Sequence, residues 1–310
     1  MRKILLAIQT LRTHQWSKNL FVFAALVFSK RLFELHSFSQ SLLGFALFSL
    51  ASGSVYIFND INDIKSDSQN PQKRLRPIAA GKISMTEAVG LFIFLGSVSI
   101  IASFYLKPTF GLIVLSYIIL NILYSVILKH IVIIDVMVIA SGFLMRVMAG
   151  AELIDVYPSK WLILCTILLS LFLAFGKRRN EIIAMGEQAN NHREVLKHYN
   201  AYFLDQLIAI VMAATLMAYM LYTVSEETVN FFGNKYLVWT MPFVLYGLFR
   251  YFYLVHKKEK DSVSMPLDAG RSVSKHRSDP AELLLRDLPL LINIILWLIS
   301  CIVIIYYFNR

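Results

Sequence analysis

The chain has 310 residues, of which 57% are hydrophobic and 16% are charged. Soluble domains are about half apolar and about a quarter charged, so this composition excludes a soluble enzyme, a disordered chain and a disulfide scaffold. A transmembrane helix takes about 20 apolar residues, and long apolar runs fill most of this sequence. We therefore predict an all-α integral membrane protein with a single polytopic membrane domain over residues 1–310.

Nine apolar runs predict nine transmembrane helices. Helices are the expected spanning elements because no run shows the alternation of apolar and polar residues that membrane β-barrel strands require. The runs lie near residues 20–29, 38–58, 86–106, 110–128, 131–151, 161–175, 204–224, 236–255 and 288–308. The first run is the shortest, and its boundary is the least defined.

The basic residues indicate which loops face the cytoplasm. The chain carries 30 Lys and Arg against 20 Asp and Glu, and in a membrane protein this excess indicates cationic cytoplasmic loops, not nucleic-acid binding. With the N-terminus inside, 23 basic residues lie in the inside segments and six in the outside loops. The inside segments are 1–19, 59–85, 129–130, 176–203 and 250–287. This split predicts a multi-pass protein of the cytoplasmic (inner) membrane, with its N-terminus and active site facing the cytoplasm.

The most informative pattern lies just after the second run. Asn59 is followed by Asp60, Asp63 and Asp67, and steps of three and four residues put the three carboxylates on one helical face. Three like charges on one stripe repel each other unless a cation lies between them, and Mg²⁺ prefers oxygen ligands of this kind. The stripe therefore predicts a Mg²⁺ site that binds a diphosphate. The alternative is a solvated loop with acidic and basic patches.

Polar and basic side chains at the ends of several spans are candidates for binding substrate phosphates, because guanidinium and ammonium groups are common partners of phosphate oxygens. These candidates are Lys18, Asn19, Lys73, Arg74, Arg76, Lys177 and Arg178. For the pair that opens the first span, the alternative is an interfacial anchor beside Trp16. For the pair that closes the sixth span, the alternative to binding an anionic headgroup is a purely topological role.

Arg146 lies within the fifth predicted span, where an unpaired charge costs about 2.5–3.5 kcal/mol on insertion scales. Asp135 and two glycines share its helical face, and Tyr124 and Lys129 lie at the same cytoplasmic end. These residues predict a polar stripe that leads inward and binds substrate. The alternative is an arginine paired within the bundle, with the glycines allowing close helix packing.

Nine helices with an N-D-x-x-D-x-x-x-D motif at the second cytoplasmic edge resemble the UbiA superfamily of intramembrane prenyltransferases. The motif consists of Asn59, Asp60, Asp63 and Asp67. The resemblance implies that these residues hold Mg²⁺ and the diphosphate of the donor, with the three aspartates catalytic. It covers nearly the whole chain.

Two segments depart from the aromatic prenyltransferases of that superfamily. Their second aspartate motif, D-x-x-x-D, is reduced here to Asp135 followed by Ile139, and the first helix carries QWSKN at residues 15–19. The chain instead resembles the decaprenyl-phosphate phosphoribosyltransferases. That resemblance rests on residues 15–19, 73–81, 128–130, 146–150, 159–161, 176–178 and 285–287.

The second resemblance implies Mg²⁺-dependent transfer of a 5-phosphoribosyl group from phosphoribosyl pyrophosphate (PRPP) to a polyprenyl phosphate, in cell-envelope biosynthesis. It implies that Lys73, Arg74 and Arg76 neutralise the leaving group, and that the isoprenoid tail lies in a lateral groove open to the bilayer. Candidates to hold the lipid phosphate or the 5-phosphate are Lys18, Lys129, Lys177 and Arg178. One alternative is an aromatic polyprenyltransferase that uses 4-hydroxybenzoate or a similar acceptor. Another is a transporter or lipid-binding protein.

Overall fold

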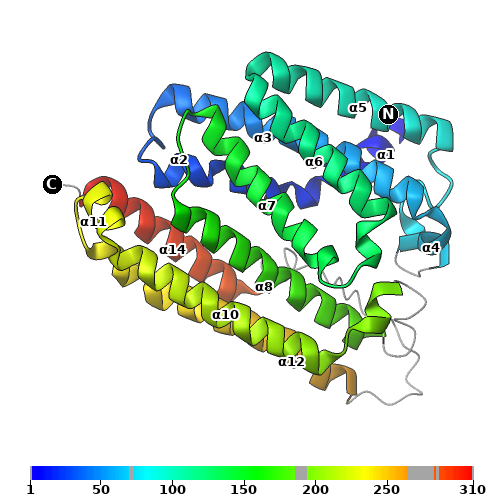
Figure 1. The fold of residues 1–310 in the computed structure, drawn as a ribbon. Coiled ribbons are helices and arrows are strands. Elements are labelled where there is room, and N and C mark those ends of the chain that lie inside the picture. The colour runs from blue at the N-terminus through cyan, green and yellow to red at the C-terminus, as the bar shows by residue number, and fades with distance from the viewer. Residues whose placement is uncertain (1, 70–72, 186–193, 264–282, 284–285, 309–310) are drawn as a thin grey trace. The chain divides into compact units, whose positions relative to one another are not determined.

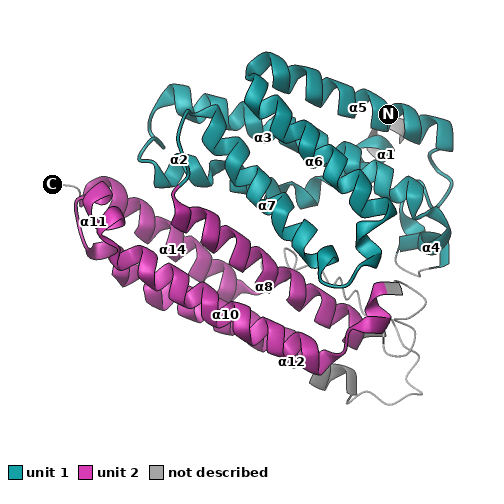
Figure 2. Ribbon diagram, viewed as in Figure 1, with its two compact units in different colours: residues 1–158 teal, residues 159–310 magenta. Residues whose placement is uncertain are grey.

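A computed structural model describes residues 2–69, 73–185, 194–263, 283 and 286–308. These residues form helices and connecting turns, with no strand among them. The chain divides into two compact units, residues 1–158 and 159–310 (Figure 2). The single polytopic domain predicted over the whole chain stays a prediction. Parts of the predicted cytoplasmic segments 176–203 and 250–287 lie outside the described residues.

Unit 1 is built around one long helix, α3, which packs against α5, α6, α7 and the 3₁₀ helix η1 (Figure 1). The elements of unit 1 are α1 (Arg2–Thr10), η1 (Thr13–Phe23), α2 (Ala24–Phe28), α3 (Leu35–Asn62), α4 (Ile64–Gln69), η2 (Lys73–Leu75), α5 (Met85–Leu106), α6 (Pro108–Val126), η3 (Leu128–His130) and α7 (Ile134–Leu153). The predicted carboxylate motif therefore lies at the end of the central helix of this unit.

Unit 2 is a second helical bundle, in which α8 packs against α10 and α12, and α12 packs against α14. Its elements are α8 (Lys160–Met185), η5 (Glu194–His198), α10 (Ala201–Val224), α11 (Glu226–Phe232), η6 (Tyr236–Thr240), α12 (Met241–Val263) and α14 (Leu288–Tyr307). Trp297 donates a hydrogen bond to the hydroxyl of Tyr219 at 2.9 Å, and this hydroxyl lies 2.6 Å from that of Thr240. Such bonds join membrane helices where water is absent.

Eight helices in the described part of the chain are long and apolar enough to cross a membrane. They are α3, α5, α6, α7, α8, α10, α12 with the preceding η6, and α14. The predicted all-α, multi-pass membrane protein is confirmed, but the count of nine spans is not. The first predicted span, near residues 20–29, is covered by the end of η1 and the five-residue helix α2, because regular α-helix begins only at Ala24.

Small residues let η1 pack closely on α7. A Cβ atom added to Gly150 would lie 1.8 Å from the carbonyl oxygen of Val22, so only glycine fits at this position. Val22 also packs with Phe48, Val114 and Ala149 in a buried apolar cluster. This contact fixes the N-terminal segment against the helices that carry the candidate site residues.

Hydrogen bonds from Lys107 and Arg31 connect the loops at the end of unit 1 that lies away from the carboxylate motif. Lys107 donates through Nζ to Oδ1 of Asp155 at 2.5 Å and to the carbonyl oxygen of Glu152 at 2.6 Å. The hydrogen bond from Lys107 holds the pKa of the Asp155 carboxyl below its usual value. Arg31 donates to the carbonyl oxygen of Ile154 at 2.6 Å. These polar contacts therefore hold residues 152–155 against the segments that carry Arg31 and Lys107.

Candidate active site

The three predicted carboxylates lie where α3 passes into α4. α3 ends one residue before Asp63 and α4 begins one residue after it, so the predicted continuous helix is interrupted there. The N–H of Asp63 still donates to the carbonyl of Asn59 at 2.9 Å, and the N–H of Asp67 donates to that of Asp63 at 2.8 Å. Helical hydrogen bonding therefore continues across the break and keeps the carboxylate cluster (Asp60, Asp63 and Asp67) together.

Arg76 joins the two buried members of the carboxylate cluster. Its Nη1 lies 3.0 Å from Oδ1 of Asp60 and 2.5 Å from Oδ2 of Asp67. These aspartates are 3% and 1% exposed, and buried charges of this kind need such partners. Nζ of Lys73 lies 3.6 Å from Oδ1 of Asp67. Two of the three basic residues predicted next to the motif thus contact it.

Two further basic residues reach the cluster from distant parts of unit 1. Lys129, in η3, donates to Oδ1 of Asp63 at 2.7 Å. Arg12, in the turn between α1 and η1, donates to Oδ1 of Asp60, and its guanidinium lies 5.3 Å from the centre of the Tyr56 ring. Sequence analysis identified Lys129 but missed Arg12. Arg12 lies 48 residues from Asp60 and outside the motifs considered, so no local spacing indicates the contact.

The oxygen atoms of the cluster suit a Mg²⁺ ion, because hard cations bind carboxylate oxygens. Oδ1 of Asp67 is buried and accepts no hydrogen bond, and its charged neighbour is Nζ of Lys73 at 3.6 Å. No three His, Cys, Asp or Glu side chains among the described residues converge as a metal site. The basic partners hold the carboxylates instead, so an entering metal ion would have to replace some of these contacts.

Arg146 lies in the interior of unit 1 and is 5% exposed. Its Nε donates to Oδ1 of Asn19 at 2.8 Å, its Nη1 to the carbonyl of Gly142 at 2.6 Å and its Nη2 to the hydroxyl of Tyr117 at 2.9 Å. Three aromatic rings surround the guanidinium, with centres 4.8–5.5 Å away. These contacts match the alternative of an arginine paired within the bundle, and its role toward a substrate stays a prediction.

Asn19 is almost fully buried and completes this network. Its Nδ2 donates to Oγ of Ser49 at 3.0 Å, and its Oδ1 accepts from Oγ of Ser52 at 3.2 Å as well as from Arg146. The amide therefore ties η1 to α3 and α7. Substrate binding by Asn19 remains a prediction that these contacts do not test.

The other candidates in unit 1 differ in their exposure. Lys18 in η1 and Tyr124 in α6 are half-buried, and Arg74 in η2 is exposed. Asp135 is completely buried in the first turn of α7. The proposed substrate contacts of these four residues stay predictions.

The basic pair at the end of the sixth predicted span belongs to unit 2. Lys177 is half-buried, whereas Arg178 is fully buried and donates through Nη1 to Oε2 of Glu181 at 2.7 Å. The neighbouring Arg179 is also buried and donates through Nε to Oδ1 of Asp205 at 2.5 Å. Both arginines thus form ion pairs inside the bundle, and substrate binding by Lys177 and Arg178 stays a prediction.

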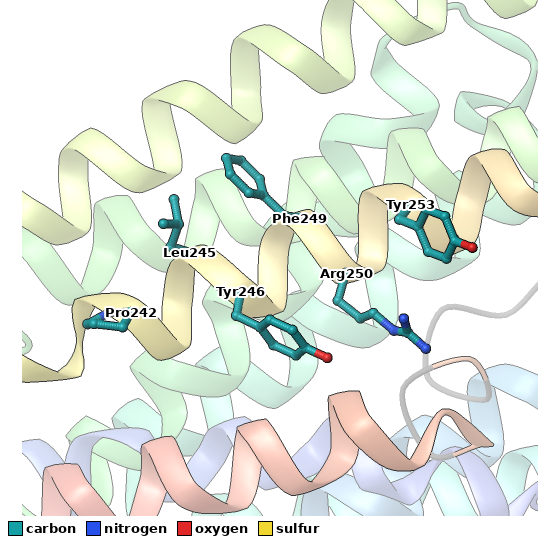
Figure 3. Close-up of a pocket in the computed structure, with 6 residues that line it drawn as sticks. All are labelled: Pro242, Leu245, Tyr246, Phe249, Arg250 and Tyr253. Atoms are coloured by element: carbon teal, nitrogen blue, oxygen red, sulfur yellow. The ribbon is translucent and has the colours of Figure 1, made fainter.

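Unit 2 also carries an open pocket of about 400 Å³ on α12 (Figure 3). Its lining residues are Pro242, Leu245, Tyr246, Phe249, Arg250 and Tyr253. Arg250 extends toward α14, where Nε and Nη2 donate to the two carboxylate oxygens of Asp287 at 3.1 and 2.9 Å. The lining contains no carboxylate, so this pocket offers no ligand set for a metal–diphosphate. The predicted groove for an isoprenoid tail stays a prediction.

Comparison with known proteins decides the family. Residues 19–267 match the UbiA prenyltransferase family. This chain belongs to that family. The resemblance predicted from the motifs is therefore confirmed, and with it the assignment to a family of membrane-embedded transferases.

Several curated relatives of this UbiA-family chain carry the name decaprenyl-phosphate phosphoribosyltransferase. The protein from Mycobacterium tuberculosis is 28% identical over 94% of this chain and 91% of its own length. The protein from Mycolicibacterium smegmatis is 29% identical over 94% of this chain and 89% of its own length. The protein from Corynebacterium glutamicum is 31% identical over 79% of this chain and 75% of its own length. The chain thus aligns with these relatives over most of their length.

Solved structures share the fold. A UbiA homologue from Archaeoglobus fulgidus bound to DMAPP and Mg²⁺ has a TM-score of 0.69 and 14% identity, covering 97% of this chain and 99% of the homologue. A digeranylgeranylglyceryl phosphate synthase has a TM-score of 0.67 and 16% identity, covering 99% of each chain. At these identities the likeness shows the fold alone, and it confirms the predicted UbiA-like helical architecture.

Proposed function

We propose that this UbiA-family protein transfers the 5-phosphoribosyl group of PRPP to a polyprenyl phosphate in a Mg²⁺-dependent reaction. The curated relatives that match most of the chain carry the name of this activity. The reaction takes place at the cytoplasmic face of the membrane, which is the side that the distribution of basic residues predicts.

The contact between Lys129 and Asp63 is the observation that most supports a phosphoribosyl donor. It adds a fourth basic side chain to a cluster already contacted by Arg12, Lys73 and Arg76. A prenyl donor presents one diphosphate, whereas PRPP presents a diphosphate and a separate 5-phosphate. The surplus of cations over carboxylates suits the donor with more negative charge.

The chemistry requires one bond to form and one to break at C1 of the ribose. An oxygen of the lipid phosphate bonds to C1 from the opposite face, while the C1–O bond to pyrophosphate breaks and its electron pair leaves with pyrophosphate. The lipid phosphate is already an anion at neutral pH, so no residue has to remove a proton from it. The protein therefore needs to orient the two substrates and to stabilise the charge that develops on pyrophosphate.

The site residues divide between these two tasks. Asp60, Asp63 and Asp67, with Asn59, are the residues that would hold Mg²⁺, which when bound offsets the negative charge of the pyrophosphate. Lys73 and Arg76 donate to oxygens of the leaving pyrophosphate, and Arg74 contributes to the same positive field from the surface. Lys129 and Lys18 bind the 5-phosphate or the lipid phosphate.

The test is turnover by the purified full-length protein in detergent. PRPP, Mg²⁺ and decaprenyl phosphate together should yield a lipid-linked phosphoribose, measured with radiolabelled PRPP and mass spectrometry. Asp60→Asn and Asp63→Asn should each lower the rate on the order of 10² to 10³-fold, because each removes electrostatic stabilisation of the transition state. Excess Mg²⁺ should restore part of the lost rate.

Asp155→Asn is the matched control, because it changes an aspartate at the opposite end of unit 1. Its rate should stay close to that of the unmodified protein. Consumption of a polyprenyl diphosphate with 4-hydroxybenzoate, and none of PRPP, would replace this proposal with an aromatic prenyltransferase. Near-normal turnover in the Asn variants would mean that the carboxylates only pair with the neighbouring basic side chains and hold no catalytic metal.

A further inference from the structure

Every aspartate of the carboxylate cluster contacts a basic side chain. Asp60 binds Arg12 and Arg76, Asp67 binds Arg76 and Lys73, and Asp63 binds Lys129. The three carboxylates therefore do not converge on a position for a cation. A metal ion that enters alone would have to break ion pairs and bring additional positive charge to the same place.

The balance of charge favours a metal that arrives together with an anion. Three carboxylates and four basic side chains in contact leave one net positive charge at the cluster. Free Mg²⁺ would increase this charge and meet like-charge repulsion. A diphosphate ester carries about three negative charges, so its magnesium complex carries about one and would neutralise the cluster.

Arg12 is placed to take part in such an exchange. Its guanidinium contacts Asp60 and the ring of Tyr56, and its side chain is 16% exposed. The preceding residue, Leu11, packs on α3 where a Cβ at Gly53 would come within 2.8 Å of it. The backbone is thus held close to α3, while the planar guanidinium has the donor geometry that phosphate oxygens accept.

We propose that Arg12 is a further donor-binding residue, which moves from Asp60 to the diphosphate when the metal and diphosphate bind together. Asp60 is then released to the metal, while Arg76 still holds the cluster through Asp67. This inference rests on the proposed function, because it takes the diphosphate of the donor as the anion. It predicts that metal binding and diphosphate binding are strongly cooperative.

The test measures metal binding and not turnover. The full-length protein in detergent is titrated with Mn²⁺ as the probe for Mg²⁺, with and without inorganic pyrophosphate, and bound Mn²⁺ is measured by electron paramagnetic resonance. In the unmodified protein, pyrophosphate should tighten Mn²⁺ binding about tenfold or more, beyond the affinity of Mn²⁺ for pyrophosphate in solution. Arg12→Gln should reduce this gain about tenfold, since a hydrogen bond between charged groups is lost.

Arg31→Gln is the control, because Arg31 contacts the carbonyl of Ile154 at the far end of unit 1 and should leave the titration unchanged. Arg12→Lys keeps the charge and should retain part of the gain. Without pyrophosphate, Arg12→Gln should bind Mn²⁺ more tightly than the unmodified protein, because Asp60 has lost one competing cation. If Arg12→Gln does not fold, Arg12→Lys and the titration of the unmodified protein still decide.

The outcomes separate this inference from the proposed function. Equal Mn²⁺ affinity with and without pyrophosphate would overturn the exchange. An unchanged gain in Arg12→Gln would make Arg12 a structural partner of Asp60 only. A cooperative, Arg12-dependent gain in a protein that does not consume PRPP would support the inference and overturn the proposed function. No Mn²⁺ binding under either condition would overturn both.

Discussion

At the scale of single residues, Arg146 is a buried cation whose hydrogen bonds go to neutral oxygens. Its three acceptors are the side chain of Asn19, the carbonyl of Gly142 and the hydroxyl of Tyr117. In the described part of the chain, no carboxylate pairs with it. Aromatic rings on its flanks add the attraction between a cation and a π face. The arginine thereby links η1, α6 and α7.

Arg146→Ala should therefore destabilise the protein in addition to weakening PRPP use by about tenfold. Each lost hydrogen bond to a charged group contributes about 1.5–3 kcal/mol in soluble proteins and less in membranes, so we expect a total loss of about 2–4 kcal/mol. Reversible unfolding in mixed micelles measures the free energy of unfolding, and a PRPP titration measures donor use. Arg31→Ala, which removes a half-exposed arginine, should lose less than about 1 kcal/mol.

Unchanged stability of Arg146→Ala, together with weaker PRPP binding, would contradict the structural interpretation of Arg146. It would indicate that this side chain acts mainly on the substrate. Loss of stability with unaltered PRPP use in the folded fraction would remove Arg146 from the proposed donor site.

At the scale of elements, the packing of η1 on α7 decides where Asn19 lies. η1 runs over 11 residues, which is long for a 3₁₀ helix, whose hydrogen bonds have poorer geometry than those of an α-helix. Tertiary contacts must therefore stabilise it. Gly150 permits one of these contacts, because its missing side chain leaves room for the carbonyl of Val22.

Gly150→Ala should separate η1 from α7, since the new Cβ atom would lie 1.8 Å from the carbonyl oxygen of Val22. Overpacking of this kind costs about 1–3 kcal/mol or more. The thermal midpoint of the purified protein should fall, and turnover should fall with it because Asn19 and Arg146 shift. Gly90→Ala on α5 is the control: no atom lies within 4 Å of the new Cβ, so the midpoint should stay the same or rise slightly. Equal midpoints for Gly150→Ala and Gly90→Ala would contradict the close contact.

At the scale of the whole molecule, orientation in the membrane decides which substrates can reach the carboxylate cluster. PRPP, the proposed donor, is a charged, water-soluble compound, so a cluster that binds it must open to the compartment that supplies it. The split of 23 basic residues against six predicts that residues 59–85 face the cytoplasm. Three candidate spans, α5, α6 and α7, separate Tyr157 from this segment, so we expect Tyr157 on the opposite side.

Lys82→Cys should resist a membrane-impermeant maleimide added to intact cells, and Tyr157→Cys should react. Both positions are exposed in the structure, so access across the membrane decides the result. The background is a variant in which Cys165 and Cys301 are replaced by alanine, and permeabilised cells should label both introduced cysteines. Labelling of Lys82→Cys in intact cells would reverse the orientation and move the cluster away from cytosolic PRPP.

The sequence alone determined the class of protein and the location of most helices. A bilayer accepts only long apolar helices, so eight of the predicted runs coincide with helices of the structure. The carboxylate motif was also predictable, because Asp60, Asp63 and Asp67 are neighbours along one helical segment and their spacing is local. The first run was the exception: it is divided between the end of the 3₁₀ helix η1, which packs against α3 and α7, and the five-residue helix α2.

Only the tertiary structure decided which cations contact the carboxylates. Arg12 meets Asp60 across 48 residues and Lys129 meets Asp63 across 66. Such contacts depend on how η1, α3 and η3 pack, and helical periodicity carries no information about partners at that separation. The same holds for Arg146, whose place inside a span indicated a polar partner without revealing that Asn19 and Tyr117 supply neutral oxygens. Local spacing thus predicts the ligands on one helix, whereas packing between helices selects their counter-charges.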